Sequence, residues 1–333
     1  MLHILEITFP FFALVLCGYA VARCGWLPLE AIPGLNLFVL YFALPCMLFR
    51  FGAATPIARM LDPSIFGTYL LCALAMVGLC VVTTRRGPVG WNDAAFGALV
   101  AAFPNSGFMG VPLLVGLLGE RAAAPAIVAL AVDMVITASL CIALSRLGSG
   151  TGAGAGAGTA QAQGSGQAVL NALKGMATNP LPWAIGLGCV VSASGVTLPA
   201  VLMRPVAMLA DAASPVALFA LGAMLARSSM RIAVTASAST ASRRSDVPQI
   251  VFYKLIVHPA LVLGTGRLAI AAGAPLDAFA ATVLALVAAL PSASNVPMLA
   301  ERFGADGGRI ARIVLVSTAL AFLSFSAAVA LLV

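Results

Sequence analysis

The segment VAAFPNSGFMGVP at residues 100–112 returns in altered form as VAALPSASNVP at residues 287–297. Each copy is a mostly apolar stretch that carries two prolines with Asn and Ser between them. Because proline removes a backbone N–H and clashes with the preceding turn, an α-helix cannot run unaltered through either pair. The four predicted helix breaks are Pro104, Pro112, Pro291 and Pro297. The pattern predicts two broken helices at matching positions of an internal repeat.

The composition places most of the chain in a lipid bilayer. Hydrophobic residues make up 62% of the sequence and charged residues 9%, against about 25% charged in a soluble domain. The net charge of +7 does not indicate nucleic-acid binding, because the basic residues lie between apolar segments rather than along one face. The seven cysteines lie almost entirely in apolar runs without a CxxC motif, so we interpret them as buried hydrophobic residues. No metal or cofactor is expected.

Ten segments are long and apolar enough to span the membrane, which takes about 20 residues per helix. They lie at about 3–22, 34–53, 64–83, 94–118, 122–146, 179–195, 203–226, 248–272, 277–300 and 309–332. The sequence therefore predicts an all-α integral membrane protein with ten transmembrane helices, of which the fourth and the ninth are broken.

A polar segment divides the ten helices into two halves. Residues 148–167 contain only Gly, Ala, Ser, Thr and Gln, a composition typical of a flexible linker. We expect a first five-helix repeat at 1–147, a cytoplasmic linker at 148–175 and a second repeat at 176–333. Because five is an odd number, the second repeat must be inverted relative to the first.

The distribution of basic residues predicts the orientation. Loops after odd-numbered segments hold more than twice as many Arg and Lys residues as loops after even-numbered ones. Since cytoplasmic loops are the richer in Lys and Arg, both termini are expected outside the cytoplasm, in a protein of the inner (plasma) membrane.

The broken helices suggest a binding site near the bilayer midplane. Non-helical backbone at this depth is tolerated only inside protein or beside a water-filled cavity, and paired broken helices are typical of secondary transporters. Half-helix N-termini carry partial positive charge, which suits a carboxylate. The alternative is that the prolines are ordinary kinks. The candidate substrate-binding residues are Asn105, Ser106, Gly107, Ser292, Ser294 and Asn295.

Two acidic residues within predicted spans are candidates for ion coupling. Asp133 lies in the middle of the fifth segment, where a carboxylate costs at least about 2.5–3.5 kcal/mol and needs a partner or a proton. Asp211 is the second candidate. For both, the alternative is a structural hydrogen bond between helices. Lys254 and His258 form an i, i+4 pair, and Lys254 either neutralises an internal carboxylate or extends to the cytoplasmic surface.

Several motifs resemble the auxin efflux carrier family, and most closely its bacterial malonate-transporter-like members. They are NLFVLYFALP at 36–45, PVALFALG at 215–222, Lys254-Leu255 followed by Pro259, and PSASNVPMLAERFG at 291–304. The resemblance implies two inverted five-helix repeats, whose fourth and ninth helices cross near a central substrate site. It also implies an elevator-like cycle and an organic-anion substrate, and it leaves the coupling ion open between H⁺ and Na⁺. The oligomeric state stays open, a homodimer included.

The function predicted from these features is secondary active transport of malonate or a similar small carboxylate. The alternative is a membrane-embedded sensor that binds its ligand without moving it. An enzyme is not expected, because the chain carries no HExxH or GxSxG motif and no paired catalytic carboxylates.

Overall fold

The computed structural model describes residues 2–54, 62–85, 89–146, 180–196, 198–236 and 246–333. All the regular elements in these ranges are helices, and one isolated antiparallel β-bridge joins two of the connecting segments. The predicted linker lies outside the described residues. The prediction of an all-α membrane protein is confirmed at this level.

The helices follow the predicted segments closely. The first half contains α1 (Leu2–Arg23), α2 (Ala31–Phe38), η1 (Val39–Ala43), α3 (Leu44–Ala54), α5 (Pro63–Thr84), α6 (Trp91–Ala102), η2 (Ser106–Gly110), α7 (Val111–Leu118), η3 (Glu120–Ala122), α8 (Ala123–Val132), η4 (Asp133–Thr137) and α9 (Ala138–Arg146). The second contains α11 (Pro180–Ser194), α12 (Ala200–Ala236), α13 (Val247–Phe252), η6 (Tyr253–Val257), α14 (His258–Ala271), α15 (Ala278–Ala289), α16 (Val296–Arg302) and α17 (Gly307–Leu332).

Among the described residues, six helices are long and apolar enough to cross a membrane. They are Ala31–Ala54, Pro63–Thr84, Glu120–Arg146, Ala200–Arg227, Val247–Ala271 and Gly307–Leu332. Shorter apolar helices coincide with the other predicted segments, at Phe9–Arg23, Ser106–Leu118, Trp183–Ser194 and Ala278–Ala289. The fourth and ninth segments fall short because the helix is interrupted in each.

Each interrupted segment breaks once rather than twice. The helical backbone stops after Ala102 and after Ala289, and non-helical residues follow. The second prolines, Pro112 and Pro297, lie instead in the first turns of α7 and α16. Proline is tolerated in the first turn of α16 because the first N–H groups of a helix have no partner within it, whereas Pro112 lies just after the π-helical turn η2. The prediction that these two prolines break a helix is therefore corrected.

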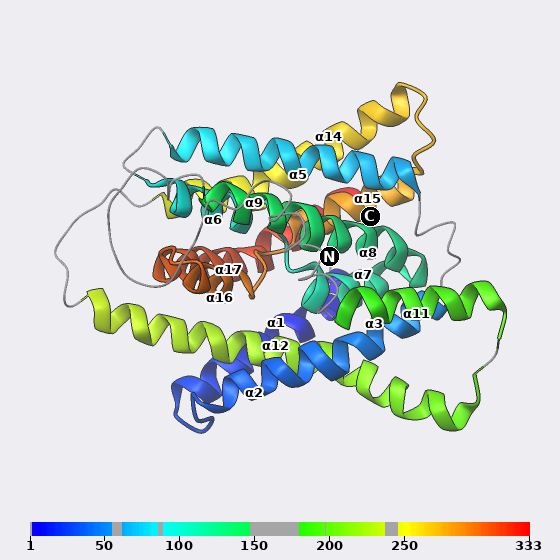
Figure 1. Ribbon diagram of the computed structural model, residues 1–333, viewed down its shortest axis with the longest axis horizontal. Coiled ribbons are helices and arrows are strands. Elements are labelled where there is room, and N and C mark those ends of the chain that lie inside the picture. The colour runs from blue at the N-terminus through cyan, green and yellow to red at the C-terminus, as the bar shows by residue number, and fades with distance from the viewer. Residues whose placement is uncertain (1, 55–61, 86–88, 147–179, 197, 237–245) are drawn as a thin grey trace.

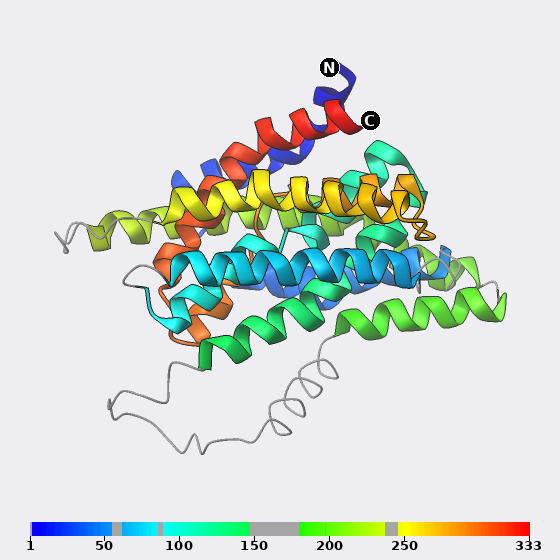
Figure 2. The ribbon, with the colours of Figure 1, turned by 90° about the horizontal axis from the view of Figure 1, so that it is seen from above.

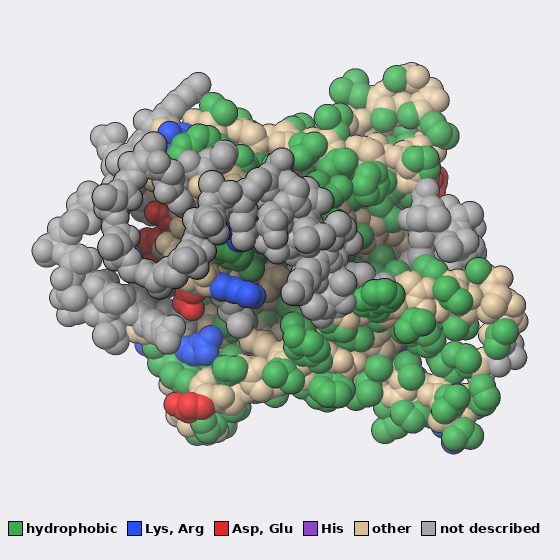
Figure 3. Space-filling model, viewed as in Figure 1, with side chains coloured by type: hydrophobic (Ala, Val, Ile, Leu, Met, Phe, Trp, Pro, Cys, Tyr) green, Lys and Arg blue, Asp and Glu red, His purple; other side chains and the backbone are tan. Residues whose placement is uncertain are grey.

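The helices form two groups (Figure 1). The first body consists of α1, α2, η1, α3, α11 and α12, which pack mainly on one another. The second body consists of α5 to α9 and α13 to α17, with their η segments. Figure 2 shows the same helices from above, with the two termini side by side. Most of the visible charged side chains in Figure 3 lie toward one end of a largely hydrophobic surface.

Two helix pairs of the first body approach each other at glycines. The glycines are Gly18 of α1 with Gly222 of α12, and Gly52 of α3 with Gly188 of α11. At each position, a Cβ atom would collide with a backbone carbonyl oxygen of the facing helix. Gly18 and Gly188 are 170 residues apart, as are Gly52 and Gly222, so the same contact is made twice at one repeat spacing.

We expect Gly18→Leu to destabilise the first body. Overpacking of this kind costs about 1–3 kcal/mol when side chains can move aside, and here the obstacle is backbone. The midpoint temperature of the purified protein in detergent should fall by several degrees. The matched control is Gly78→Leu in α5, where a Cβ has nothing within 4 Å. Equal midpoints for the two variants would show that the close approach of α1 and α12 is not required.

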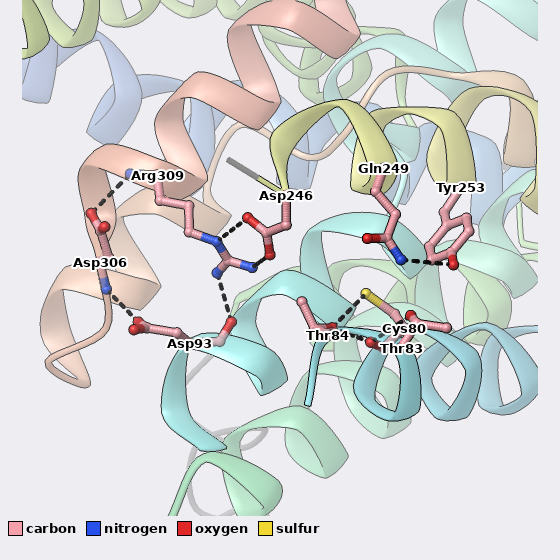
Figure 4. Close-up of polar contacts among 9 residues, drawn as sticks. All are labelled: Cys80, Thr83, Thr84, Asp93, Asp246, Gln249, Tyr253, Asp306 and Arg309. Atoms are coloured by element: carbon pink, nitrogen blue, oxygen red, sulfur yellow. Dashed lines mark hydrogen bonds and ion pairs between the residues drawn. The ribbon is translucent and has the colours of Figure 1, made fainter. Parts of the chain in front are cut away.

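A polar network ties together one end of the second body (Figure 4). Nε and Nη2 of Arg309, in α17, donate to the two carboxylate oxygens of Asp246 at 2.8 and 2.5 Å. Nη1 of Arg309 donates to the backbone oxygen of Asp93 in α6 at 2.7 Å, and the Asp93 carboxylate accepts from the backbone N of Asp306 at 2.8 Å. The network joins the starts of α6, α13 and α17.

Candidate functional site

The two helix breaks meet in the interior of the second body. The backbone N of Asn105 donates to the oxygen of Pro291 at 2.8 Å, and the N of Ala293 donates to the oxygen of Phe103 at 3.0 Å. These bonds form the antiparallel bridge between Pro104 and Ser292. They satisfy backbone groups that the interrupted helices leave unpaired, as a buried break requires. We call these two paired segments, 103–106 and 290–295, the crossing.

Two residues of the crossing, and His258 beside Lys254, carry buried polar side-chain atoms without partners. Nδ2 of Asn105, Oγ of Ser292 and Nε2 of His258 are buried and have no hydrogen-bond partner among the described residues. The Asn105 side chain is 2% exposed, and Ser292 and His258 are fully buried. Each such atom costs about 1–3 kcal/mol, so a ligand that supplied the missing partners would recover that free energy.

The other predicted binding residues occupy different environments. Oγ of Ser106 donates to the oxygen of Pro104 at 3.3 Å, so this hydroxyl already has a partner. Ser294 is buried, and Gly107 is half-buried at the start of the second half-helix. Asn295 is exposed at the N-cap position of α16, where its side chain makes no capping hydrogen bond. The repeat offset of 187 residues pairs Asn105 with Ser292, which is also buried, rather than with Asn295, which lies 190 residues away.

Asp133 lies inside the second body and accepts two hydrogen bonds. Its side chain is fully buried. The hydroxyl of Tyr69 in α5 donates to Oδ2 at 2.7 Å, and Oγ1 of Thr137 donates to Oδ1 at 3.2 Å. Residues Asp133–Thr137 form a π-helical turn, a departure that is frequent at functional sites.

Lys254 points into the protein rather than toward the membrane surface. Its side chain is fully buried, and Nζ donates to the backbone oxygen of Ala288 at 3.0 Å and lies 3.2 Å from Nδ1 of His258. It is close enough to Asp133 for their charges to interact. Of the two alternatives for Lys254, the structure does not support extension to the cytoplasmic surface, because the amine lies inside the second body. The Ala288 oxygen lies in the last turn of α15, just before the crossing.

Tyr69 is a site residue that the sequence reasoning missed. A tyrosine within an apolar helix gives no functional signal of its own. The repeat spacing contains a signal nonetheless, because Tyr69 and Lys254 are 185 residues apart, the same separation as Pro112 and Pro297. The two residues that approach Asp133 from α5 and η6 thus hold matching positions in the two halves.

Asp211 lies outside this buried cluster. Its side chain is 69% exposed and forms an ion pair of 2.7 Å with Nη1 of Arg50, which is 36% exposed. Both residues line a cavity of about 710 Å³ between the two bodies. Within the described ranges, His, Cys, Asp and Glu side chains form no group of three suited to a metal ion.

Comparison with known proteins reveals similarity along nearly the whole chain. A family model described as "Membrane transport protein" matches residues 3–162 and 166–329. A Rhizobium meliloti (strain 1021) protein named "Putative malonate transporter" is 30% identical over 327 residues, which cover 96% of this chain and 93% of that protein. The Escherichia coli (strain K12) protein named "Uncharacterized transporter YfdV" is 26% identical over 304 residues, covering 88% of this chain and 86% of its own.

Proposed function

The chain belongs to the membrane transport protein family, and from that premise we propose that it carries malonate or a similar small dicarboxylate by secondary active transport. Family membership confirms the resemblance inferred from the motifs, and it makes the chain a multi-pass membrane transporter rather than an enzyme. The substrate, the mechanism and the coupling ion belong to the proposal. A malonate-related substrate is supported by the name of the Rhizobium meliloti relative.

The observation that carries the proposal is the set of unpartnered polar atoms at the crossing. Two half-helices begin beside it, η2 at Ser106 and α16 at Val296, and their first N–H groups add partial positive charge. A carboxylate could accept from Nδ2 of Asn105 and from the hydroxyl of Ser292. We propose Asn105, Ser106, Gly107, Ser292, Ser294 and Asn295 as the substrate site, with Asn105 and Ser292 as its buried centre.

We propose that the ten helical segments form two inverted five-helix repeats. The antiparallel bridge between Pro104 and Ser292 supports this arrangement, because segments related by an inversion cross in opposite directions. Glycines with positive φ at matching positions of the two halves support the inverted repeat as well. Gly25 and Gly195 have φ of 75° and 64° at the 170-residue spacing, and Gly119 and Gly304 have φ of 82° and 70° at the 185-residue spacing.

The division into two bodies supports an elevator-like cycle. The crossing and Asp133 both belong to the second body, and the cavity lined by Asp211 lies between that body and the first. Movement of the second body along the first would carry a bound substrate between the two sides of the inner membrane. Both termini would lie outside the cytoplasm, as the basic loops predict.

We propose that Asp133 couples transport to protons. The ammonium group of Lys254 already occupies the carbonyl oxygen of Ala288 at the end of α15, a position that would otherwise suit a Na⁺ ion. The amine of Lys254, which interacts electrostatically with the buried Asp133 carboxyl group, thus takes the place that a coupling Na⁺ would need, and this favours H⁺ as the exchangeable ion. Asp211 remains the second candidate for this role, since it faces a solvent-accessible cavity.

Uptake of radiolabelled malonate into proteoliposomes tests the proposal directly. A transporter gives uptake that saturates with concentration and that unlabelled malonate inhibits. The alternative sensor would bind malonate without filling the vesicles. Absence of uptake across a panel of mono- and dicarboxylates would contradict the proposed function.

We expect Asn105→Ala to reduce malonate kcat/KM by about 5- to 150-fold, the loss that corresponds to about 1–3 kcal/mol of hydrogen bonding. Asn295→Ala should impair transport less, because Asn295 is exposed and Asn105 is buried. Initial rates in proteoliposomes at equal protein content provide the measurement. The matched control is Asn36→Ala in α2, outside the crossing. Wild-type uptake by both crossing variants would rule out the site.

A further inference from the structure

The cavity between the two bodies is large enough for a ligand and is lined by charged side chains. Its volume of about 710 Å³ falls in the range of small-molecule sites, about 300–1,000 Å³. One wall comes from α3 and α12 of the first body and contains Arg50 and Asp211. The opposite wall comes from α7, η3 and α8 of the second body and contains Glu120 and Arg121.

The cavity reaches the second body close to the crossing without including it. Its lining extends to Pro112, in the first turn of α7, whereas Asn105 and Ser292 are not part of it. The half-helix η2, residues Ser106–Gly110, lies between the two sites. The cavity is therefore distinct from the crossing and lies next to it along the chain.

Arg50 is held in the cavity by a weak partner. Its ion pair with Asp211 joins α3 to α12, and the two side chains are 36% and 69% exposed. Exposed ion pairs gain little free energy, because water competes for both charges. A carboxylate ligand can therefore replace Asp211 at small cost and engage the planar guanidinium through two parallel hydrogen bonds.

Arg121 provides a second cation on the other wall. Its side chain is exposed, and its guanidinium lies over the ring of Phe279 at 5.2 Å. Neither the ion pair of Arg50 nor the ring contact of Arg121 uses all five hydrogen-bond donors of a guanidinium. The cavity thus has a guanidinium on each wall, so a dicarboxylate meets a cation for each of its carboxylates, whereas a monocarboxylate has use for one.

We propose that this cavity is an outer dicarboxylate-binding subsite, in which Arg50 takes one carboxylate and Asp211 is the counter-ion that the ligand displaces. The inference rests on the proposed function, since this subsite would supply the crossing with its substrate. It gives Asp211 a role that is separate from ion coupling. It also explains why two charged residues of α3 and α12 face a cavity in a chain that is 9% charged.

A reporter thiol at the cavity measures anion binding independently of transport. Ala54 lines the cavity and is exposed, so Ala54→Cys in the full-length protein places a thiol there. The thiol is alkylated with neutral iodoacetamide, and the peptide that contains residue 54 is quantified by mass spectrometry. Chymotryptic cleavage after Phe51 separates that peptide from the seven native cysteines in every variant, those at position 50 included. The probe ligands are malonate and acetate.

In the reporter protein, malonate should slow alkylation, and acetate should need about a tenfold higher concentration for the same effect. Arg50→Gln should raise the half-protecting malonate concentration by about tenfold or more and remove the preference over acetate. Asp211→Asn should lower the half-protecting malonate concentration by about threefold, because an anion that competes with malonate for Arg50 is removed. The half-protecting malonate concentration of Arg50→Lys should lie between those of the wild type and Arg50→Gln, since lysine keeps the positive charge but lacks the two parallel hydrogen-bond donors of the guanidinium.

The matched control is Arg204→Gln, which removes an exposed Arg from α12 outside the cavity lining. Equal protection in the Arg50→Gln and Arg204→Gln proteins would overturn the subsite. So would weaker protection in Asp211→Asn, because a merely structural ion pair fails in the same direction whichever partner is lost. Malonate uptake is measured in parallel. Protection without uptake would contradict the transport proposal and leave the subsite standing.

Discussion

Asp133→Asn should abolish the accumulation of malonate that a pH gradient drives. The amide keeps the size of the side chain and an acceptor for the Tyr69 hydroxyl, which lies 2.7 Å from Oδ2. It cannot exchange a proton. With the membrane potential clamped at zero, a gradient of one pH unit supports about tenfold accumulation per coupled proton. We expect that ratio to fall to about one, measured with radiolabelled malonate in proteoliposomes.

Exchange of internal for external malonate should persist in the Asp133→Asn protein, which would separate a coupling defect from a folding defect. The matched control is Asp277→Asn at the N-cap of α15, where asparagine also caps well. Because the variant leaves the buried amine of Lys254 without an acidic neighbour, adding Lys254→Met should recover stability but not gradient-driven uptake. Undiminished accumulation by Asp133→Asn would assign the carboxyl group a structural role.

Arg309→Met should lower the free energy of unfolding by about 3–5 kcal/mol. The Arg309 and Asp246 side chains are only 12% and 16% exposed, so loss of the guanidinium leaves a largely buried carboxylate without its partner. The variant also removes the hydrogen bond to the Asp93 backbone. Denaturant titration in mixed micelles provides the measurement.

The control for Arg309 is Arg302→Met, a substitution at an exposed Arg that should change stability by less than about 0.5 kcal/mol. Combining Arg309→Met with Asp246→Asn should recover part of the loss, because the stranded charge is removed. An unfolding free energy of Arg309→Met equal to that of Arg302→Met would mean that the network joining α6, α13 and α17 contributes nothing to the second body.

Hydropathy predicted where several of the helices begin and end. The segment predicted at 64–83 is α5 at Pro63–Thr84, and the segment predicted at 309–332 is α17 at Gly307–Leu332. Helix formation in lipid depends on the residues of one segment, because each segment must satisfy its own backbone hydrogen bonds. The motifs likewise identified the family, since they are properties of the sequence alone.

The sequence predicted where the two helix breaks lie, but it did not predict that their backbones are hydrogen-bonded to each other. Two matched breaks predicted a site, while the bridge between Pro104 and Ser292 depends on how helices 187 residues apart are packed. Each break contains one asparagine, and the sequence does not indicate which of Asn105 and Asn295 is buried. Packing buries the first and exposes the second, because the two half-helices have different neighbours.

The tertiary structure alone decided the charge partners. Lys254 had two open alternatives, and its inward direction follows from the Ala288 oxygen 3.0 Å away. Tyr69 reaches Asp133 across 64 residues of sequence, and Arg50 reaches Asp211 across 161. Burial of one charge is a local property that hydropathy records. Neutralisation of a buried charge depends on a second residue that helix packing brings close. Neither of the two sequence segments alone specifies that contact.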